Sequence, residues 1–143
     1  VNMPFDFDIV GAVHSPETKW EDINSLQNKS VGWIRGYAYD QYIDLPMQIY
    51  EVNNRESGVK MVKAKRLDFF LDAMIQLEDD LDQSLLEGLV VDKSIKLGLY
   101  YAFAENEKGK QLLNIYETKY KEIMESGKLK ELFDKWEFDW NFK

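Results

Sequence analysis

Short apolar segments, rich in β-branched and aromatic residues, alternate with helix-like segments along this chain. Alternation of this kind favours an α/β fold, in which helices pack on a central sheet. The strands are expected at Asp6–Val13, Lys29–Arg35, Met47–Val52, Leu67–Ala73, Gly88–Ile95 and Lys96–Glu105. The apolar run over Lys29–Arg35 is the clearest of the early strands, and we expect it to be an interior parallel strand.

Helical patterns lie between these strands and dominate the end of the chain. Before residue 100, short helical segments are expected at Trp20–Leu26, Tyr37–Ile43, Arg55–Arg66 and Met74–Leu86. Further on, a broad apolar stripe over Leu112–Met124 predicts a long helix, and Gly127 is a suitable stop for it. A second stripe, over Leu129–Trp136, predicts a second helix, so the chain ends in a helical tail.

Composition narrows the range of partners. The 143 residues suit one domain, and 45% hydrophobic with 31% charged residues is a globular balance. The net charge of −8 argues against nucleic acid, and against an anionic membrane, as the main partner. The chain has no cysteine, which excludes disulfides and thiolate metal sites.

We expect no metal site, no cofactor and no catalytic residue. His14 is the single histidine, so a cluster of histidine ligands is impossible. The acidic run over Glu78–Gln83 lacks the ligand spacing of a calcium loop and predicts a solvated helix face.

The junction Arg35-Gly36-Tyr37-Ala38 is the best candidate for a binding site. A helix beginning here would offer backbone N–H groups to a carboxylate or phosphate, with Gly36 for a sharp turn and Arg35 for a bidentate contact. The alternative is an ordinary turn with a surface arginine. Asp72 lies near the carboxyl end of another strand, where it could meet an ammonium group, or it could cap the next helix.

Three segments, in order, resemble type 2 periplasmic solute-binding proteins, the amino-acid-binding family of ABC transporters. They are INSLQNKSVGWIRGYAYDQYI, IYEVNNRESGVKMVKAKRLDFFLDA and the closing segment from LGLYYAFAE to FDKW. Together they cover about Ile23 to Trp136. The resemblance implies a Rossmann-like sheet flanked by helices that forms the second lobe of a two-lobed protein.

The resemblance also implies site residues. Gly36 corresponds to the family's turn glycine, and Tyr37 and Ala38 to the next two residues, whose backbone holds the ligand α-carboxylate. The family often has threonine or serine there, which this chain lacks. The family's aspartate for the ligand amine falls at Ala73, one position after Asp72.

We therefore treat residues 1–143 as one α/β domain, with the second lobe over about residues 12–98 and a returning strand and helices over about 99–143. A first lobe and leader, about 80–100 residues in such proteins, is expected to be absent from this chain. The two apolar stripes of the tail would then need another cover, either a second copy of the chain or the chain's own sheet.

On function, the resemblance implies an extracytoplasmic lobe, periplasmic or extracellular, whose signal peptide lies outside this chain. It would bind a small polar, amino-acid-like solute and deliver it to an ABC transporter permease, without catalysis. A ligand-sensing domain of a membrane receptor is the main alternative. The sequence also leaves open an enzyme or a helical interaction module, and an enzyme would need an acid–base pair of which only Asp72 is a candidate.

Overall fold

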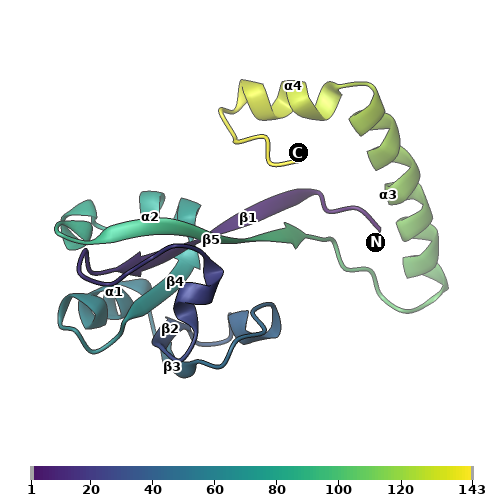
Figure 1. Cartoon of the computed structure of the whole chain (residues 1–143). Coiled ribbons are helices and arrows are strands. Elements are labelled where there is room, and N and C mark those ends of the chain that lie inside the picture. The colour runs from purple at the N-terminus through teal and green to yellow at the C-terminus, as the bar shows by residue number, and fades with distance from the viewer. Residues whose placement is uncertain (1, 143) are drawn as a thin grey trace. The chain divides into compact units, whose positions relative to one another are not determined.

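A computed structural model describes residues 2–142 of the chain (Figure 1). It divides into two compact units, which we call the sheet unit, Asp8–Leu97, and the helical unit, formed by residues up to Phe7 and from Gly98 onward. Two long strands, β1 (Asp6–His14) and β5 (Val90–Leu99), continue from one unit into the other. The sequence analysis divides the chain into a second lobe over about residues 12–98 and a returning segment over about 99–143, and these limits stay a prediction.

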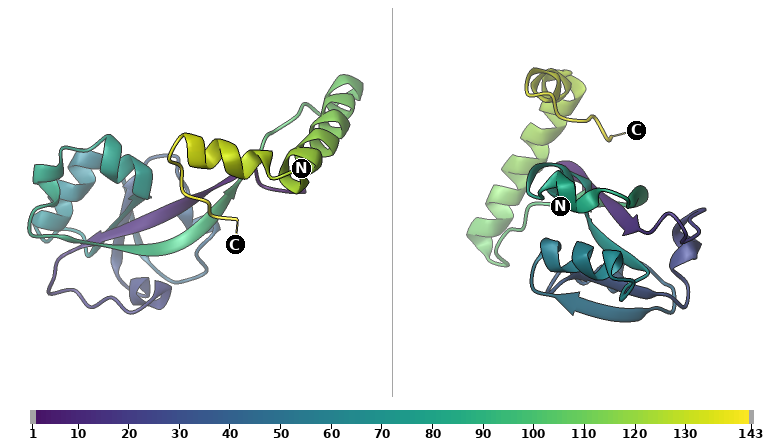
Figure 2. Two further views of the ribbon diagram at one scale, coloured as in Figure 1. Left: turned by 90° about the horizontal axis from the view of Figure 1, so that it is seen from above. Right: turned by 90° about the vertical axis from the view of Figure 1, so that its left-hand side faces the viewer.

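The sheet unit contains three further strands, which are β2 (Ser30–Ile34), β3 (Gln48–Val52) and β4 (Phe69–Ala73). The strand order is β3-β2-β4-β1-β5. β2 is parallel to both β3 and β4, whereas β1 is antiparallel to β4. β2 is therefore the interior parallel strand that the sequence predicts, and β1 and β5 run side by side in both views of Figure 2.

Helices and short 3-10 turns cover the two faces of this sheet. The sheet unit has α1 (Arg55–Lys63), α2 (Met74–Asp79) and 3-10 turns at Ile23–Leu26, Tyr39–Gln41 and Gln83–Leu86. Alternate residues of β4 point to opposite faces. Phe69 and Leu71 join a core cluster with Trp33, while Phe70 joins a second cluster with Val59 of α1 and Leu77 of α2.

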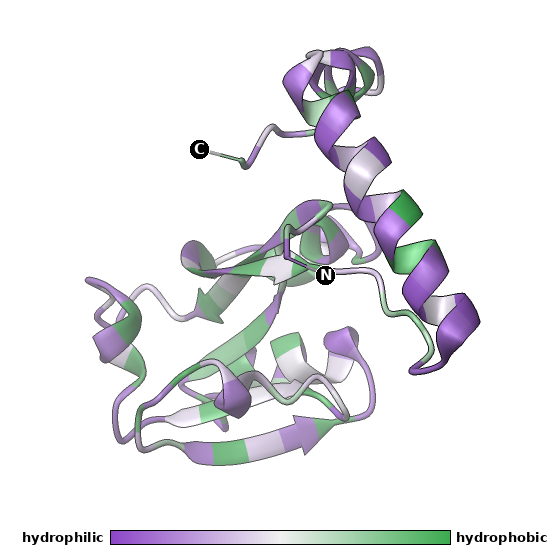
Figure 3. Cartoon of the chain, turned by 90° about the vertical axis from the view of Figure 1, so that its right-hand side faces the viewer, coloured by the Kyte–Doolittle hydropathy of each residue, from purple (hydrophilic) through white to green (hydrophobic). Residues whose placement is uncertain are grey.

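The helical unit consists of the strand ends together with α3 (Glu107–Glu125) and α4 (Lys128–Lys135). Gly127, with a φ of 77°, ends α3 at the position that the sequence predicts. The Tyr120 hydroxyl donates a 2.7 Å hydrogen bond to the carbonyl of Pro4, and burial raises the pKa of Tyr120 to about 12. Apolar positions on α3 are interspersed with strongly hydrophilic ones (Figure 3).

The α/β class predicted from the sequence is confirmed, but three element predictions are wrong. Tyr37–Ile43 contains only a three-residue 3-10 turn, because Ala38 adopts a left-handed conformation that no helix continues. Met74–Leu86 is split, since the Gln83 amide donates to the carbonyls of Leu77, Glu78 and Leu81 and so closes the end of α2. The two strands expected over residues 88–105 are one strand, β5, which ends at Leu99.

The close packing of α1 on β4 gives a test of the core. A Cβ atom at Gly58 would lie 2.2 Å from the buried ring of Phe70, so Gly58→Ala should destabilise the protein by about 1–3 kcal/mol, despite the higher helix propensity of alanine. Urea unfolding measures the change. Adding Phe70→Leu should make the two effects clearly non-additive, whereas simple additivity would contradict the packing.

Candidate functional site

The three parallel strands end at one edge of the sheet unit, which we call the carboxyl edge. The register pairs Ile34 with Val52 across β2 and β3, and Gly32 with Phe70 across β2 and β4. The segments that follow these strands therefore lie next to one another. They supply the loop 35–38 after β2, the start of α1 after β3, and Asp72 at the end of β4.

The loop 35–38 is fixed by backbone hydrogen bonds. The Arg35 N–H donates to the carbonyl of Val52 at 2.9 Å, the Tyr37 N–H donates to the carbonyl of Ile34 at 3.0 Å, and the Gly36 N–H donates to the Glu51 carboxylate at 3.3 Å. Two of the N–H groups expected to face an anion are thus already bonded within the protein. The helix predicted to begin here does not form, since only a three-residue 3-10 turn follows the loop, and binding of an anion by this loop stays a prediction.

This loop carries unusual backbone conformations. Gly36 has a φ of 90°, and a Cβ atom there would meet nothing within 4 Å. Ala38 has a φ of 50°, although alanine has no polar side chain to compensate a left-handed conformation. Conformations of this kind cost about 1–3 kcal/mol and are often retained at functional sites.

Asp72 is fully buried and forms an ion pair. Its Oδ2 accepts a 3.0 Å hydrogen bond from Nε of Arg55, the first residue of α1, and its Oδ1 accepts one from the backbone N–H of Ala73 at 2.9 Å. The other end of the Arg55 guanidinium donates to Oε1 of Gln76 at 2.9 Å. Asp72 does not cap α2, whose N-cap is Ala73, so that alternative is wrong.

Burial dominates the electrostatics of Asp72. It raises the pKa of the Asp72 carboxyl above its ordinary value of 3.8, and the Arg55 guanidinium opposes this shift without overcoming it. Burial also raises the pKa of the Tyr39 hydroxyl well above its usual range, and the negative charge of Asp72 is the second largest cause of this shift. Tyr39 lies in the core just after the loop, with its ring 5.8 Å from that of Tyr37.

The structure thus brings Arg35, Gly36, Tyr37 and Ala38 to the same edge as Asp72. Arg35 and Tyr37 are exposed, and their roles in binding stay predictions. Sequence reasoning missed Arg55 and Gln76. Arg55 could have been identified from the sequence, because it follows β3 and the carboxyl ends of parallel strands share one edge.

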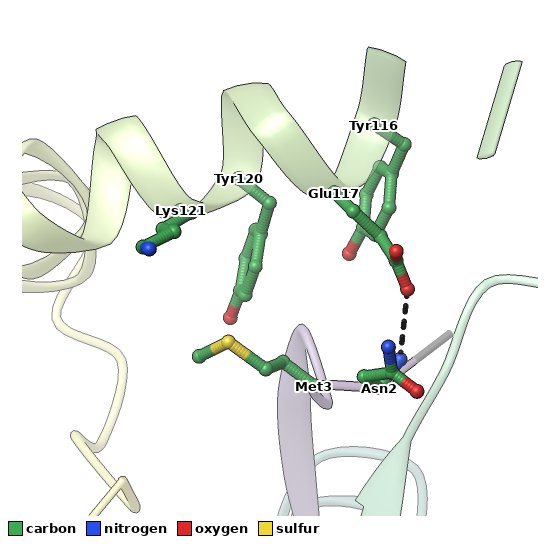
Figure 4. Close-up of a pocket in the computed structure, with 6 residues that line it drawn as sticks. All are labelled: Asn2, Met3, Tyr116, Glu117, Tyr120 and Lys121. Carbon is green, nitrogen blue, oxygen red and sulfur yellow. Dashed lines mark hydrogen bonds between the residues drawn. The ribbon is translucent and has the colours of Figure 1, made fainter. Parts of the chain in front are cut away.

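Other features of residues 2–142 include a cavity of 330 Å³ in the sheet unit, lined by Ser15, Pro16, Glu17, Val62, Lys63, Lys65, Glu87, Gly88 and Leu89. Within residues 2–142, no three histidine, aspartate or glutamate side chains form a group able to hold a metal ion. None of the helices described for these residues has the length and apolar character needed to cross a membrane. A cavity of 160 Å³ in the helical unit lies between α3 and Asn2–Met3, and is lined mostly by apolar surface of Met3, Tyr116 and Tyr120 (Figure 4).

Comparison with protein-family models gives no match, and comparison with curated proteins gives none either. Solved structures do match. The GluR0 ligand-binding core in complex with L-glutamate is 15% identical, with a TM-score of 0.68, and the match covers 93% of this chain and 61% of that one.

Two other matches have the same extent. An arginine third transport system periplasmic binding protein from Legionella pneumophila is 12% identical, with a TM-score of 0.59, and 93% of this chain covers 63% of it. The ancestral amino-acid-binding protein AncCDT-1, a precursor of cyclohexadienyl dehydratase, is 17% identical, with a TM-score of 0.59, and 93% of this chain covers 59% of it.

These likenesses establish the fold. The sheet unit with its flanking helices, followed by the helical tail, has the fold of a type 2 solute-binding protein lobe, as the sequence resemblance implies. The chain spans about 60% of the length of the matched structures. At identities of 12–17%, these matches show the fold alone, and the function has to be argued from the residues of the site.

The raised pKa of Asp72 predicts a pH dependence of stability. The folded protein holds this proton more tightly than the unfolded chain, so the contribution of Asp72 is fully present below pH 3.8 and is lost as the pH rises through the raised pKa. Asp72→Asn should remove that loss, and its stability relative to the parent should increase between acid and neutral pH. Urea unfolding at several pH values measures this, with exposed Asp44→Asn as the control. Parallel pH profiles for Asp72→Asn and the parent would contradict it.

Proposed function

We propose that this chain is a ligand-binding lobe of an extracytoplasmic solute-binding protein, and that its carboxyl edge binds a small polar, amino-acid-like solute. The observation that carries the proposal is the convergence of the loop 35–38, Arg55 and Asp72 at the ends of three parallel strands. In open α/β sheets, ligands bind beyond the carboxyl ends of the strands. The matched ligand-binding core and periplasmic binding protein support the same interpretation.

The finer parts of this proposal concern partners and location. We place the protein in the periplasm or outside the cell, where it would deliver its solute to an ABC transporter permease. Sensing by a membrane receptor is the second candidate, since a ligand-binding lobe of this fold, like the matched GluR0 ligand-binding core, could equally serve a sensor. Co-purification with a permease would support transport, and a membrane-spanning signalling domain in the same gene would support sensing.

We propose binding without catalysis. An acid–base pair needs two groups of different pKa that reach the substrate, whereas the buried carboxyl at this edge, Asp72, is bonded to Arg55. AncCDT-1 is a precursor of an enzyme, which makes catalysis worth testing. Conversion of L-glutamate or L-arginine by the purified chain, followed by NMR, would contradict this part of the proposal.

The binding proposal predicts a specific effect of the turn glycine. Gly36→Ala places a side chain on a left-handed backbone and should weaken solute binding about tenfold, because it displaces the loop. Gly88→Ala is the matched control, since Gly88 also has a positive φ, 77°, and open space around it. Both variants should lose about 1 kcal/mol of stability. Calorimetric titration with L-glutamate and L-arginine measures the affinity, and equal effects of the two variants would contradict the proposed site.

We also propose that the chain forms a homodimer through the apolar positions of α3 and α4. Four large apolar side chains at these helices are exposed, namely Leu112, Ile115, Leu132 and Trp136. Burying one such side chain stabilises an assembly by roughly 1.5–3 kcal/mol, so an uncovered group of them favours association. A self-complementary contact between two copies is the simplest way to cover it.

Sedimentation of the purified chain tests this dimer. We expect a dimer at micromolar concentration, and Ile115→Lys or Leu132→Lys should produce monomers because a buried lysine is costly. Gln111→Lys, which adds the same charge at an exposed polar position of α3, should leave the dimer intact. A monomeric parent chain would contradict the dimer and leave the ligand site unaffected.

A further inference from the structure

The arginines of this chain are distributed unevenly. There are only three, at positions 35, 55 and 66. Arg35 and Arg55 both lie at the carboxyl edge, because Arg35 comes directly after β2 and Arg55 is the first residue of α1, which follows β3, whereas Arg66 follows α1 just before β4. The planar guanidinium is well suited to bidentate recognition of a carboxylate, so its concentration at the proposed site is informative.

Asp72 cannot itself touch a solute. Its exposed fraction is 0%, and each of its oxygens already accepts a hydrogen bond, from Arg55 or from Ala73. A ligand contact requires accessible surface, which this carboxylate lacks. The ammonium contact expected from the sequence therefore has no accessible acceptor on Asp72.

Arg55, unlike Asp72, has accessible surface. Its side chain is 20% exposed, and two bonds fix its orientation, from Nε to Asp72 and from Nη2 to Gln76. No residue between 2 and 142 accepts a hydrogen bond from its Nη1. The guanidinium is thus held at one side and keeps donors for another acceptor.

We propose that Arg55 binds a carboxylate group of the solute, and that Asp72 is a positioning residue that acts through Arg55. This inference rests on the proposed function and specifies the chemistry of the same site. An arginine fixed before the ligand arrives loses less side-chain entropy on binding, which raises affinity. Arg35, exposed and without an ion pair among residues 2–142, and the half-exposed Tyr37 supply further donors nearby.

The same geometry argues against recognition of an ammonium group by Asp72. A cation placed beside Arg55 would face a guanidinium, and the carboxylate bonded to that guanidinium, Asp72, is already neutralised by it. Within this lobe the solute should therefore be selected by its carboxylate. A solute without an amine should bind here as well as an amino acid of the same length.

A titration followed by ¹H–¹⁵N NMR tests this, because three arginines give three Nε signals that single substitutions assign. The probes are glutarate, L-glutamate and 1,5-diaminopentane, which differ in their carboxylate and ammonium groups. We expect glutarate and L-glutamate to shift the Arg55 Nε signal with comparable affinity, and 1,5-diaminopentane to leave it unchanged. Binding of 1,5-diaminopentane at this edge, or L-glutamate binding far more tightly than glutarate, would overturn the inference.

Variants separate the roles of the two residues. Arg55→Gln should weaken glutarate binding by about tenfold or more, because a charged hydrogen bond is lost. Arg66→Gln should have no effect. If Arg55→Gln folds poorly because it leaves Asp72 unpaired, Arg55→Gln with Asp72→Asn removes both charges and should show the same loss. Asp72→Asn alone should weaken binding less than Arg55→Gln and broaden the Arg55 Nε signal.

The outcomes also distinguish this inference from the proposed function. If a probe shifts the backbone signals of residues 36–39 equally in the parent and in Arg55→Gln, the site binds solutes but not through Arg55, and only the inference fails. If none of the three probes shifts any signal at the carboxyl edge, both fail. If the Nε signal of Arg55 responds and Arg55→Gln abolishes binding, both are supported.

Discussion

The sheet unit depends on the complete burial of β4. All five of its residues are buried, and it pairs with β2 on one side and with β1 on the other. Because its side chains alternate between the two faces, β4 contributes to both core clusters at once. Its parallel pairing with β2 requires a crossover, which α1 supplies, and this crossover brings the ends of β2, β3 and β4 to one edge.

A carboxylate at the end of such a strand is costly. Transfer of an ion from water to the interior of a protein carries a penalty of several kcal/mol, and one guanidinium contact of 3.0 Å offsets only part of it, as the raised pKa of Asp72 indicates. An apolar residue of similar volume would be expected to give equal or greater stability. A stability cost at the edge where ligands bind to α/β sheets is typical of a functional site.

The sequence predicted β2 and β4 well, because each is a compact apolar run, and it located the loop 35–38, because β2 ends abruptly before Gly36. It did not predict the backbone there. A left-handed alanine at position 38 is set by tertiary bonds such as that from Arg35 to Val52, and no local pattern encodes it. The partner of Asp72 was missed for the same reason, since Arg55 lies 17 residues away and meets it only after β3, α1 and β4 have paired.

The two units differ in how much of their own apolar surface they cover. In the sheet unit, Trp33, Phe69 and Phe70 are fully buried, whereas α3 buries only Gly109 and Tyr120, and α4 only Phe133. Phe133 contacts the rings of Phe138, Trp140 and Phe142, so the tail folds back on α4 through an aromatic cluster. Helices with so little burial derive limited stability from packing, and short isolated helices are marginal in water. The helical unit is therefore the part of the chain whose stability should respond most to anything that covers α3 and α4, while the stability of the sheet unit is set by the core around β4.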